Sequence, residues 1–110
     1  MPKCPFCGKE ISRVDELFDD LLRQYYACPK CGEMLPISTW KLDDFLKGKY
    51  VILRPDDPEI KRKGDFVLFR GEVYKIVKAY FLKPLLALEL VEDGLVADIL
   101  KVELEGEGDA

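Results

Sequence analysis

Two copies of one short turn motif contain every cysteine of this 110-residue chain: residues 4–8 read CPFCG, and residues 28–32 read CPKCG. In each copy the proline fixes one backbone angle, and the glycine can adopt the left-handed conformation that closes a tight turn. Two such turns facing each other present four thiolates in the tetrahedral arrangement that a structural zinc ion prefers. We therefore predict that one zinc ion is bound by Cys4, Cys7, Cys28 and Cys31.

The paired CPxCG motifs resemble those of the zinc-ribbon and rubredoxin-like knuckle families, and the resemblance covers residues 4–37. It implies a zinc-ribbon-like module over residues 1–37 whose closed four-thiolate site leaves no coordination position open for chemistry. Two alternatives remain. A tetrahedral four-sulfur site also suits iron, which would make the protein a rubredoxin-like electron carrier. A dithiol redox site normally uses one Cys-x-x-Cys pair beside a βαβ unit, not two matched pairs.

The segment between the two motifs has apolar residues at the spacing of an amphipathic helix, and Ser12 followed by Asp15 fits a capping box. We therefore predict a helix here. The alternative is the β-hairpin of a plain zinc ribbon, with its turn at residues 18–21. The residues of the helical stripe are Val14, Leu17, Phe18, Leu21, Leu22 and Tyr25.

Acidic pairs at residues 15–16 and 19–20 lie in this same segment. Transcript-cleavage factors of the elongation-factor S type are similar in carrying an acidic pair on the hairpin between their cysteine pairs, where it helps hold a catalytic metal ion in the polymerase. The arginine and serine before that pair, and the proline after it, are missing here. We interpret these carboxylates as a solvated helix face, and keep an accessory factor of RNA polymerase as an alternative function.

Residues 38–48 predict a connecting helix, capped by Ser38 or Thr39, running from Trp40 to Lys47 and ended by Gly48. We expect Trp40, the only tryptophan, to fill a core or the space between domains.

From residue 49 onward the hydrophobic period becomes that of strands. The stretch 64–77 resembles the opening hairpin of SH3-like barrels, which implies a binding module. The predicted fold is therefore α+β and β-rich, with the N-terminal zinc-ribbon-like module followed by an SH3-like small β-barrel over 49–104 and a disordered acidic tail over 105–110. The expected strands are residues 50–53, 64–69, 72–80, 85–91 and 95–104.

Two of these strands, 72–80 and 85–91, are apolar on both faces, and both faces of such a sheet must be covered. The barrel interior would cover one face. The other would be covered by the Trp40 helix, the zinc-ribbon-like module or a second copy of the chain, which makes a homodimer possible; if it stays exposed, it marks a partner site.

Charge is unevenly distributed along a chain whose net charge is −4. Residues 61–84 carry seven basic and two acidic groups, whereas residues 85–110 carry one basic and eight acidic groups. If they share one face, the basic residues would form a stripe able to bind nucleic-acid phosphates, but strand alternation would send them to opposite faces. We expect a protein partner first and nucleic acid second. The basic residues are Lys61, Arg62, Lys63, Arg70, Lys75, Lys78 and Lys83.

The chain has no histidine and shows neither a nucleophile–base pair nor a phosphate-binding glycine loop, so we predict that it is not an enzyme. The expected function is a zinc-binding adaptor or regulator of the transcription or replication machinery, by fold-level analogy. The absence of asparagine, with 35% charged residues, is typical of hyperthermophile proteins, which favours an archaeal or archaeal-virus source. Without a signal sequence or a long apolar run, we expect a cytoplasmic protein and no membrane partner.

Overall fold

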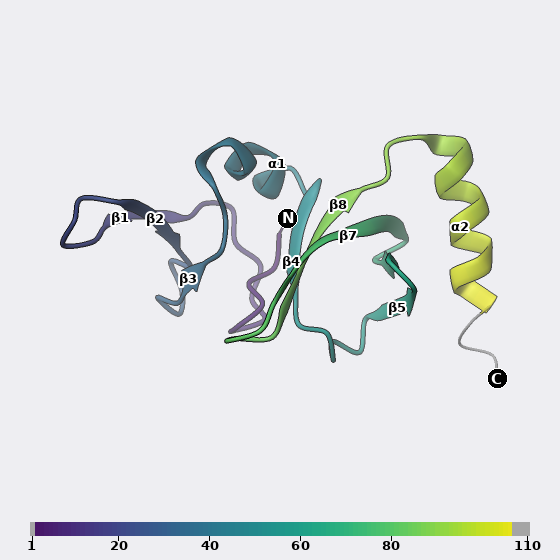
Figure 1. The fold of residues 1–110 in the computed structure, drawn as a ribbon, viewed down its shortest axis with the longest axis horizontal. Coiled ribbons are helices and arrows are strands. Elements are labelled where there is room, and N and C mark those ends of the chain that lie inside the picture. The colour runs from purple at the N-terminus through teal and green to yellow at the C-terminus, as the bar shows by residue number, and fades with distance from the viewer. Residues whose placement is uncertain (1, 107–110) are drawn as a thin grey trace. The chain divides into compact units, whose positions relative to one another are not determined.

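The computed structural model describes residues 2–106, and the chain forms two compact units, Met1–Ile52 and Leu53–Ala110 (Figure 1). It contains one three-stranded and one five-stranded sheet, with short helices after each set of strands. The protein is therefore α+β and β-rich, which confirms the predicted fold class. No helix in the described part of the chain is long and apolar enough to cross a membrane.

The first unit is built on an antiparallel sheet in the order β1-β2-β3. Strand β1 is Asp15–Phe18, β2 is Gln24–Ala27 and β3 is Met34–Leu35. The central strand runs directly into the second cysteine motif, and β3 leaves it. The sheet therefore holds that motif at one end. The buried side chains around it are Cys4, Ile11, Tyr26, Ala27, Cys28, Leu35 and Ile37.

The segment between the cysteine motifs is the β1–β2 hairpin, so the prediction of a helix was wrong. A helix of this length is marginal in water unless its apolar face packs on a core. Here Phe18, Leu21 and Leu22 stay exposed, so the apolar stripe has no core to pack on. Cross-strand pairing instead places Glu16 opposite Tyr26, whose ring is buried. The helical spacing of the apolar residues in this segment therefore does not correspond to a buried helix face.

The connecting helix is present, as a 3-10 turn at Thr39–Lys41 followed by α1 at Leu42–Leu46. Its core residue is Phe45, which is completely buried. Trp40 is 81% exposed, so the expectation that it fills a core was wrong. The short 3-10 turn directs its indole to solvent, and Phe45 provides the buried aromatic ring instead.

The five-stranded sheet is antiparallel in its β5–β8 meander and has the order β4-β8-β7-β6-β5. Consecutive strands are neighbours, except that the first strand lies beside the last, as expected for a small barrel-like sheet. The strand β5 was missed because three of its four residues are basic. The strands are β4 Tyr50–Leu53, β5 Ile60–Lys63, β6 Phe66–Phe69, β7 Glu72–Tyr80 and β8 Leu85–Leu90.

The last predicted strand, 95–104, is instead part of the helix α2, Gly94–Gly106, so that prediction was wrong. Asp93 caps this helix, because its carboxylate accepts hydrogen bonds from the amides of Leu95 (3.0 Å) and Val96 (3.1 Å). The helix contacts β5, β6 and β7 and buries Leu104 (Figure 1). Of the predicted disordered tail, residues 105 and 106 end α2, and residues 107–110 lie outside the described residues.

Candidate metal centre

The two CPxCG turns have the same backbone hydrogen bonds. The amide of Gly8 donates to the carbonyl of Cys4 at 2.9 Å, and that of Gly32 donates to the carbonyl of Cys28 at 2.8 Å. In each turn the amide of the first cysteine also donates to the carbonyl five residues later, at 3.0 Å. Both glycines have the positive φ predicted, +74° and +77°. The repeated motif thus folds twice into one local structure that directs two thiols to the same side.

The four cysteine sulfurs converge on one point, as the motif spacing predicts. All four Sγ atoms lie within 4.8 Å of one another. The Sγ atoms of Cys4 and Cys31 are 3.7 Å apart, and those of Cys7 and Cys28 are 3.8 Å apart. A tetrahedral site with metal–sulfur bonds of about 2.3 Å has sulfur–sulfur edges of about 3.8 Å, whereas a disulfide bond is about 2.0 Å long. The four free thiols therefore fit one tetrahedral metal ion.

Comparisons with protein-family models, with curated proteins and with solved structures return no match. The likeness to zinc knuckles therefore rests on the CPxCG motifs and on this sulfur geometry.

Backbone amides surround the first sulfur of each turn. The amide of Phe6 donates to Cys4 Sγ, and that of Lys30 donates to Cys28 Sγ, each at 3.4 Å. Burial raises the pKa of the Cys4 thiol to about 12. Burial also acts to raise the pKa of Cys28, but hydrogen bonds from the amides of Cys31 and Lys30 outweigh it and lower the pKa to about 7. A cation bound at this point would offset the cost of a buried Cys4 thiolate.

The site is buried on one side only. Cys4 and Cys28 are completely buried, Cys7 is half-buried and Cys31 is exposed. The two turns are also joined outside the sulfur cluster, because the Lys30 ammonium donates to the carbonyl of Glu10 at 2.8 Å. Four protein ligands with no open position are the arrangement of structural zinc sites, since catalytic sites keep one position for water or substrate.

The acidic residues of the β1–β2 hairpin do not form a second metal site. Within residues 2–106, the cysteine cluster is the one group of three or more cysteine or carboxylate side chains placed to hold a metal ion. Asp15 is paired with Arg13 at 2.7 Å, and Asp19 is engaged by its own turn. The pair Asp19–Asp20 does lie at a hairpin turn, contrary to the helical face predicted, but the Asp19 carboxylate is already occupied.

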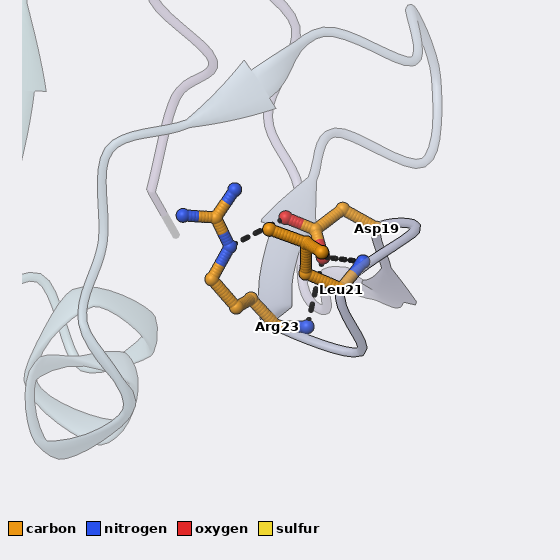
Figure 2. A network of polar contacts seen from close by, with 3 residues as sticks. All are labelled: Asp19, Leu21 and Arg23. Atoms are coloured by element: carbon orange, nitrogen blue, oxygen red, sulfur yellow. Dashed lines mark hydrogen bonds and ion pairs between the residues drawn. The ribbon is translucent and has the colours of Figure 1, made fainter.

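Asp19 closes this turn as a clasp (Figure 2). One carboxylate oxygen accepts hydrogen bonds from the amides of Leu21 and Arg23, both at 2.9 Å, and the other accepts from Arg23 Nε at 2.8 Å. The hydrogen bond from the Arg23 amide is the main reason that the pKa of Asp19 is lowered. The clasp fixes a turn whose apolar side chains point to solvent: Phe18 is 61% exposed, Leu21 72% and Leu22 81%.

The structure divides the predicted basic stripe. Directly paired residues of an antiparallel sheet share a face, so the register places four of the lysines on one face and Arg62 on the other. Arg70 lies in the β6–β7 turn, 3.5 Å from a carboxylate oxygen of Glu59, and Lys83 lies between β7 and β8. The lysines that share a face are Lys61, Lys63, Lys75 and Lys78.

Proposed function

We propose that this protein is a non-enzymatic zinc-binding adaptor, in which the metal holds the first unit together and the β1–β2 hairpin docks into a partner protein. The sulfur geometry supports the metal, and the exposed apolar hairpin turn supports the docking. Zinc suits this role because it is redox-inert, prefers four tetrahedral ligands and contributes directly to the folding of small modules.

An iron-bound electron carrier is the second candidate, because the exposed Cys31 would bring one edge of the metal site within reach of a redox partner. Metal analysis of protein purified from cells supplied with both zinc and iron separates the two. One zinc per chain and a colourless protein are expected for the adaptor. Stoichiometric iron with a red thiolate-to-iron absorption would establish the electron carrier instead.

Leu22 carries the argument that the hairpin turn is a docking element. Its φ is +59°, in the left-handed region that disfavours residues other than glycine. Its side chain is 81% exposed, so packing in a core does not compensate for the cost of this backbone conformation. Arg70 also has a positive φ, but its side chain packs over the ring of Phe69 and lies beside Glu59. A strained and exposed leucine next to Leu21 is expected where the side chain itself is needed by a partner.

The chemistry of the tip defines the partner. Phe18, Leu21 and Leu22 form an apolar tip that is large enough to fill a pocket, as interface anchors do. The pairs Asp15–Arg13 and Asp19–Arg23 are neutral, which leaves the charges of Glu16 and Asp20. The expected partner is therefore a protein with an apolar pocket rimmed by lysine or arginine.

Leu22→Gly tests the proposal without weakening the fold. Glycine accepts a φ of +59° without strain, so the variant should melt at the same temperature as wild type or slightly higher. Metal-loaded wild type and variant serve as matched baits in an extract of the source organism. A protein captured by wild type is then purified and titrated against both by calorimetry.

A partner bound at least tenfold more weakly by Leu22→Gly supports the proposal. Met34→Ser is the matched control, because Met34 is another exposed apolar residue of the first unit and lies on β3, away from the turn. Equal binding by wild type and Leu22→Gly, or equal loss in the Met34→Ser control, would overturn the docking role of the hairpin.

A further inference from the structure

A β-bulge in β7 keeps two lysines on the same face of the sheet. Lys75 and Lys78 are three residues apart, so regular alternation would send their side chains to opposite faces. The register between β7 and β8 shifts between Ile76 and Lys78, and Lys75 pairs with Glu89 while Lys78 pairs with Ala87. Residues 87 and 89 are two apart on β8 and share a face, so the bulge returns Lys78 to the face of Lys75. Bulges of this kind re-aim side chains and are commonly functional.

The neighbouring strands add to this face. Lys63 of β5 pairs with Phe66 of β6, which pairs with Lys75 of β7, so these three side chains form one row across the sheet. Further along β7, Tyr80 lies on the same face, and the Lys78 ammonium sits 4.8 Å from the centre of its ring. We call these five residues the lysine–aromatic face: Lys63, Phe66, Lys75, Lys78 and Tyr80.

The five side chains of the lysine–aromatic face reach solvent, but the next row of the same face is covered. In that row Val73 is 2% exposed, and the Lys61 ammonium donates to the carbonyl of Glu105 in α2 at 3.4 Å. The lysines of the lysine–aromatic face are exposed, and its two rings are half-buried. The opposite side of the same strands carries the fully buried Val67 and the nearly buried Phe69 and Tyr74. Directly after Tyr80, in the turn to β8, Phe81 is 90% exposed. Along β7 and into its turn, the two cations Lys75 and Lys78 are thus followed by the two aromatic rings of Tyr80 and Phe81.

We propose that the lysine–aromatic face binds single-stranded nucleic acid. Lysines spaced along a strand neutralise successive phosphates, and aromatic rings between them provide surfaces on which bases stack, whatever the sequence. A duplex hides its base faces, so the rings favour a single strand over a duplex. Both RNA and single-stranded DNA have the required chemistry. This function goes beyond the docking of a protein by the hairpin and uses residues of the other unit.

The proposal gives a definite salt dependence. Three lysines of the face, each neutralising one phosphate, give a slope of about −2 in a plot of log affinity against log salt, at roughly −0.7 per phosphate for a single strand. Affinity should then fall about 15-fold between 50 and 200 mM salt. Glu89 lies opposite Lys75 on the same face and repels phosphate, so Glu89→Gln should bind more tightly.

Fluorescence anisotropy with a labelled ten-residue oligouridine and a labelled ten-residue oligothymidine measures both affinity and slope. Lys75→Gln/Lys78→Gln should weaken binding at least tenfold and reduce the slope to about −0.7, since one lysine of the three remains. Arg54→Gln/Arg62→Gln is the matched control: it removes the same charge, but Arg62 lies on the opposite face and Arg54 follows β4. It should change the affinity less than threefold.

The aromatic part is tested by Phe81→Leu, which alters an exposed residue and so leaves the melting temperature unchanged. Loss of a stacked base should weaken binding at least fivefold with the same salt slope. The proposal is overturned if neither oligonucleotide binds at 50 mM salt and 100 µM protein, if the control loses as much affinity as the lysine variant, or if a ten-base-pair duplex binds as tightly as the single strands. The preference between oligouridine and oligothymidine then identifies RNA or DNA.

Discussion

Replacing Cys7 by serine should unfold residues 2–37, which contain β1–β3, and leave the second unit folded. Zinc bound by small cysteine sites contributes on the order of 10–16 kcal/mol of apparent folding free energy, which is comparable to the roughly 5–15 kcal/mol that stabilises a typical whole domain. Outside the metal site, residues 2–37 bury six residues, which is a small core. Loss of one ligand should therefore leave β1–β3 without enough stability to fold. The six residues are Pro2, Ile11, Tyr26, Ala27, Leu35 and Ile37.

Amide hydrogen exchange read by mass spectrometry measures both units in one sample. In Cys7→Ser, peptides covering β1, β2 and β3 should exchange within seconds, whereas peptides covering β6, β7 and β8 should keep the protection they have in wild type. Met34→Ser, an exposed change in the same unit, should match wild type throughout. Retained protection of β1–β3 in Cys7→Ser would refute the reasoning that the metal holds this unit. Equal loss in both units would show that they unfold as one.

Three further predictions concern stability. Acidification from about pH 7.5 to about pH 5 should release the metal and abolish the protection of β1–β3, because protons compete for thiolates; metal release is followed with a zinc-sensitive dye. Leu88→Ala, at a fully buried position of β8, should cost about 2–5 kcal/mol in urea unfolding of the second unit, whether or not metal is bound. Gly71→Ala should cost roughly 1 kcal/mol in the same assay, because Gly71 has a φ of +80° with open space around it.

The metal centre was predictable from sequence because it is specified locally. Each CPxCG motif sets its own turn through one proline and one glycine, so the direction of both thiols follows from five residues. Strands β6, β7 and β8 were predictable for a related reason, since their alternation is bounded by Gly64, Gly71 and a turn containing Pro84. In both cases the residues that specify the structure lie within it or directly beside it in the sequence.

Two elements were mispredicted because the prediction used only the spacing of apolar residues, whereas hydrogen bonds to aspartate side chains decide the fold of each segment. The apolar spacing between the cysteine motifs fits a helix, but the Asp19 clasp and the absence of a core for that helix favour a hairpin. Residues 95–104 contain the branched residues of a strand, but Asp93 caps their amides and starts α2. An aspartate just before an apolar run was the available signal in the second case.

The lysine–aromatic face could not be derived from sequence alone. Lys75 and Lys78 share a face only because the register shifts between them. No residue type in that stretch predicts a bulge. Pairing across β5, β6 and β7 then brings Lys63, Phe66 and Lys75 into one row. Such a face depends on register, which is fixed by the whole sheet rather than by any one strand.

The unequal burial of the four cysteines has a kinetic consequence. Cys31 is exposed and Cys7 is half-buried, whereas Cys4 and Cys28 are completely buried. A chelator or an oxidant therefore reaches one thiolate of each turn while the other stays shielded. Metal exchange should start at Cys31 and pass through an intermediate still held by the buried pair. During metal binding, an incoming ion would contact the exposed thiols first and then bind the buried pair. The same exposed edge of the site would therefore control both metal binding and metal release.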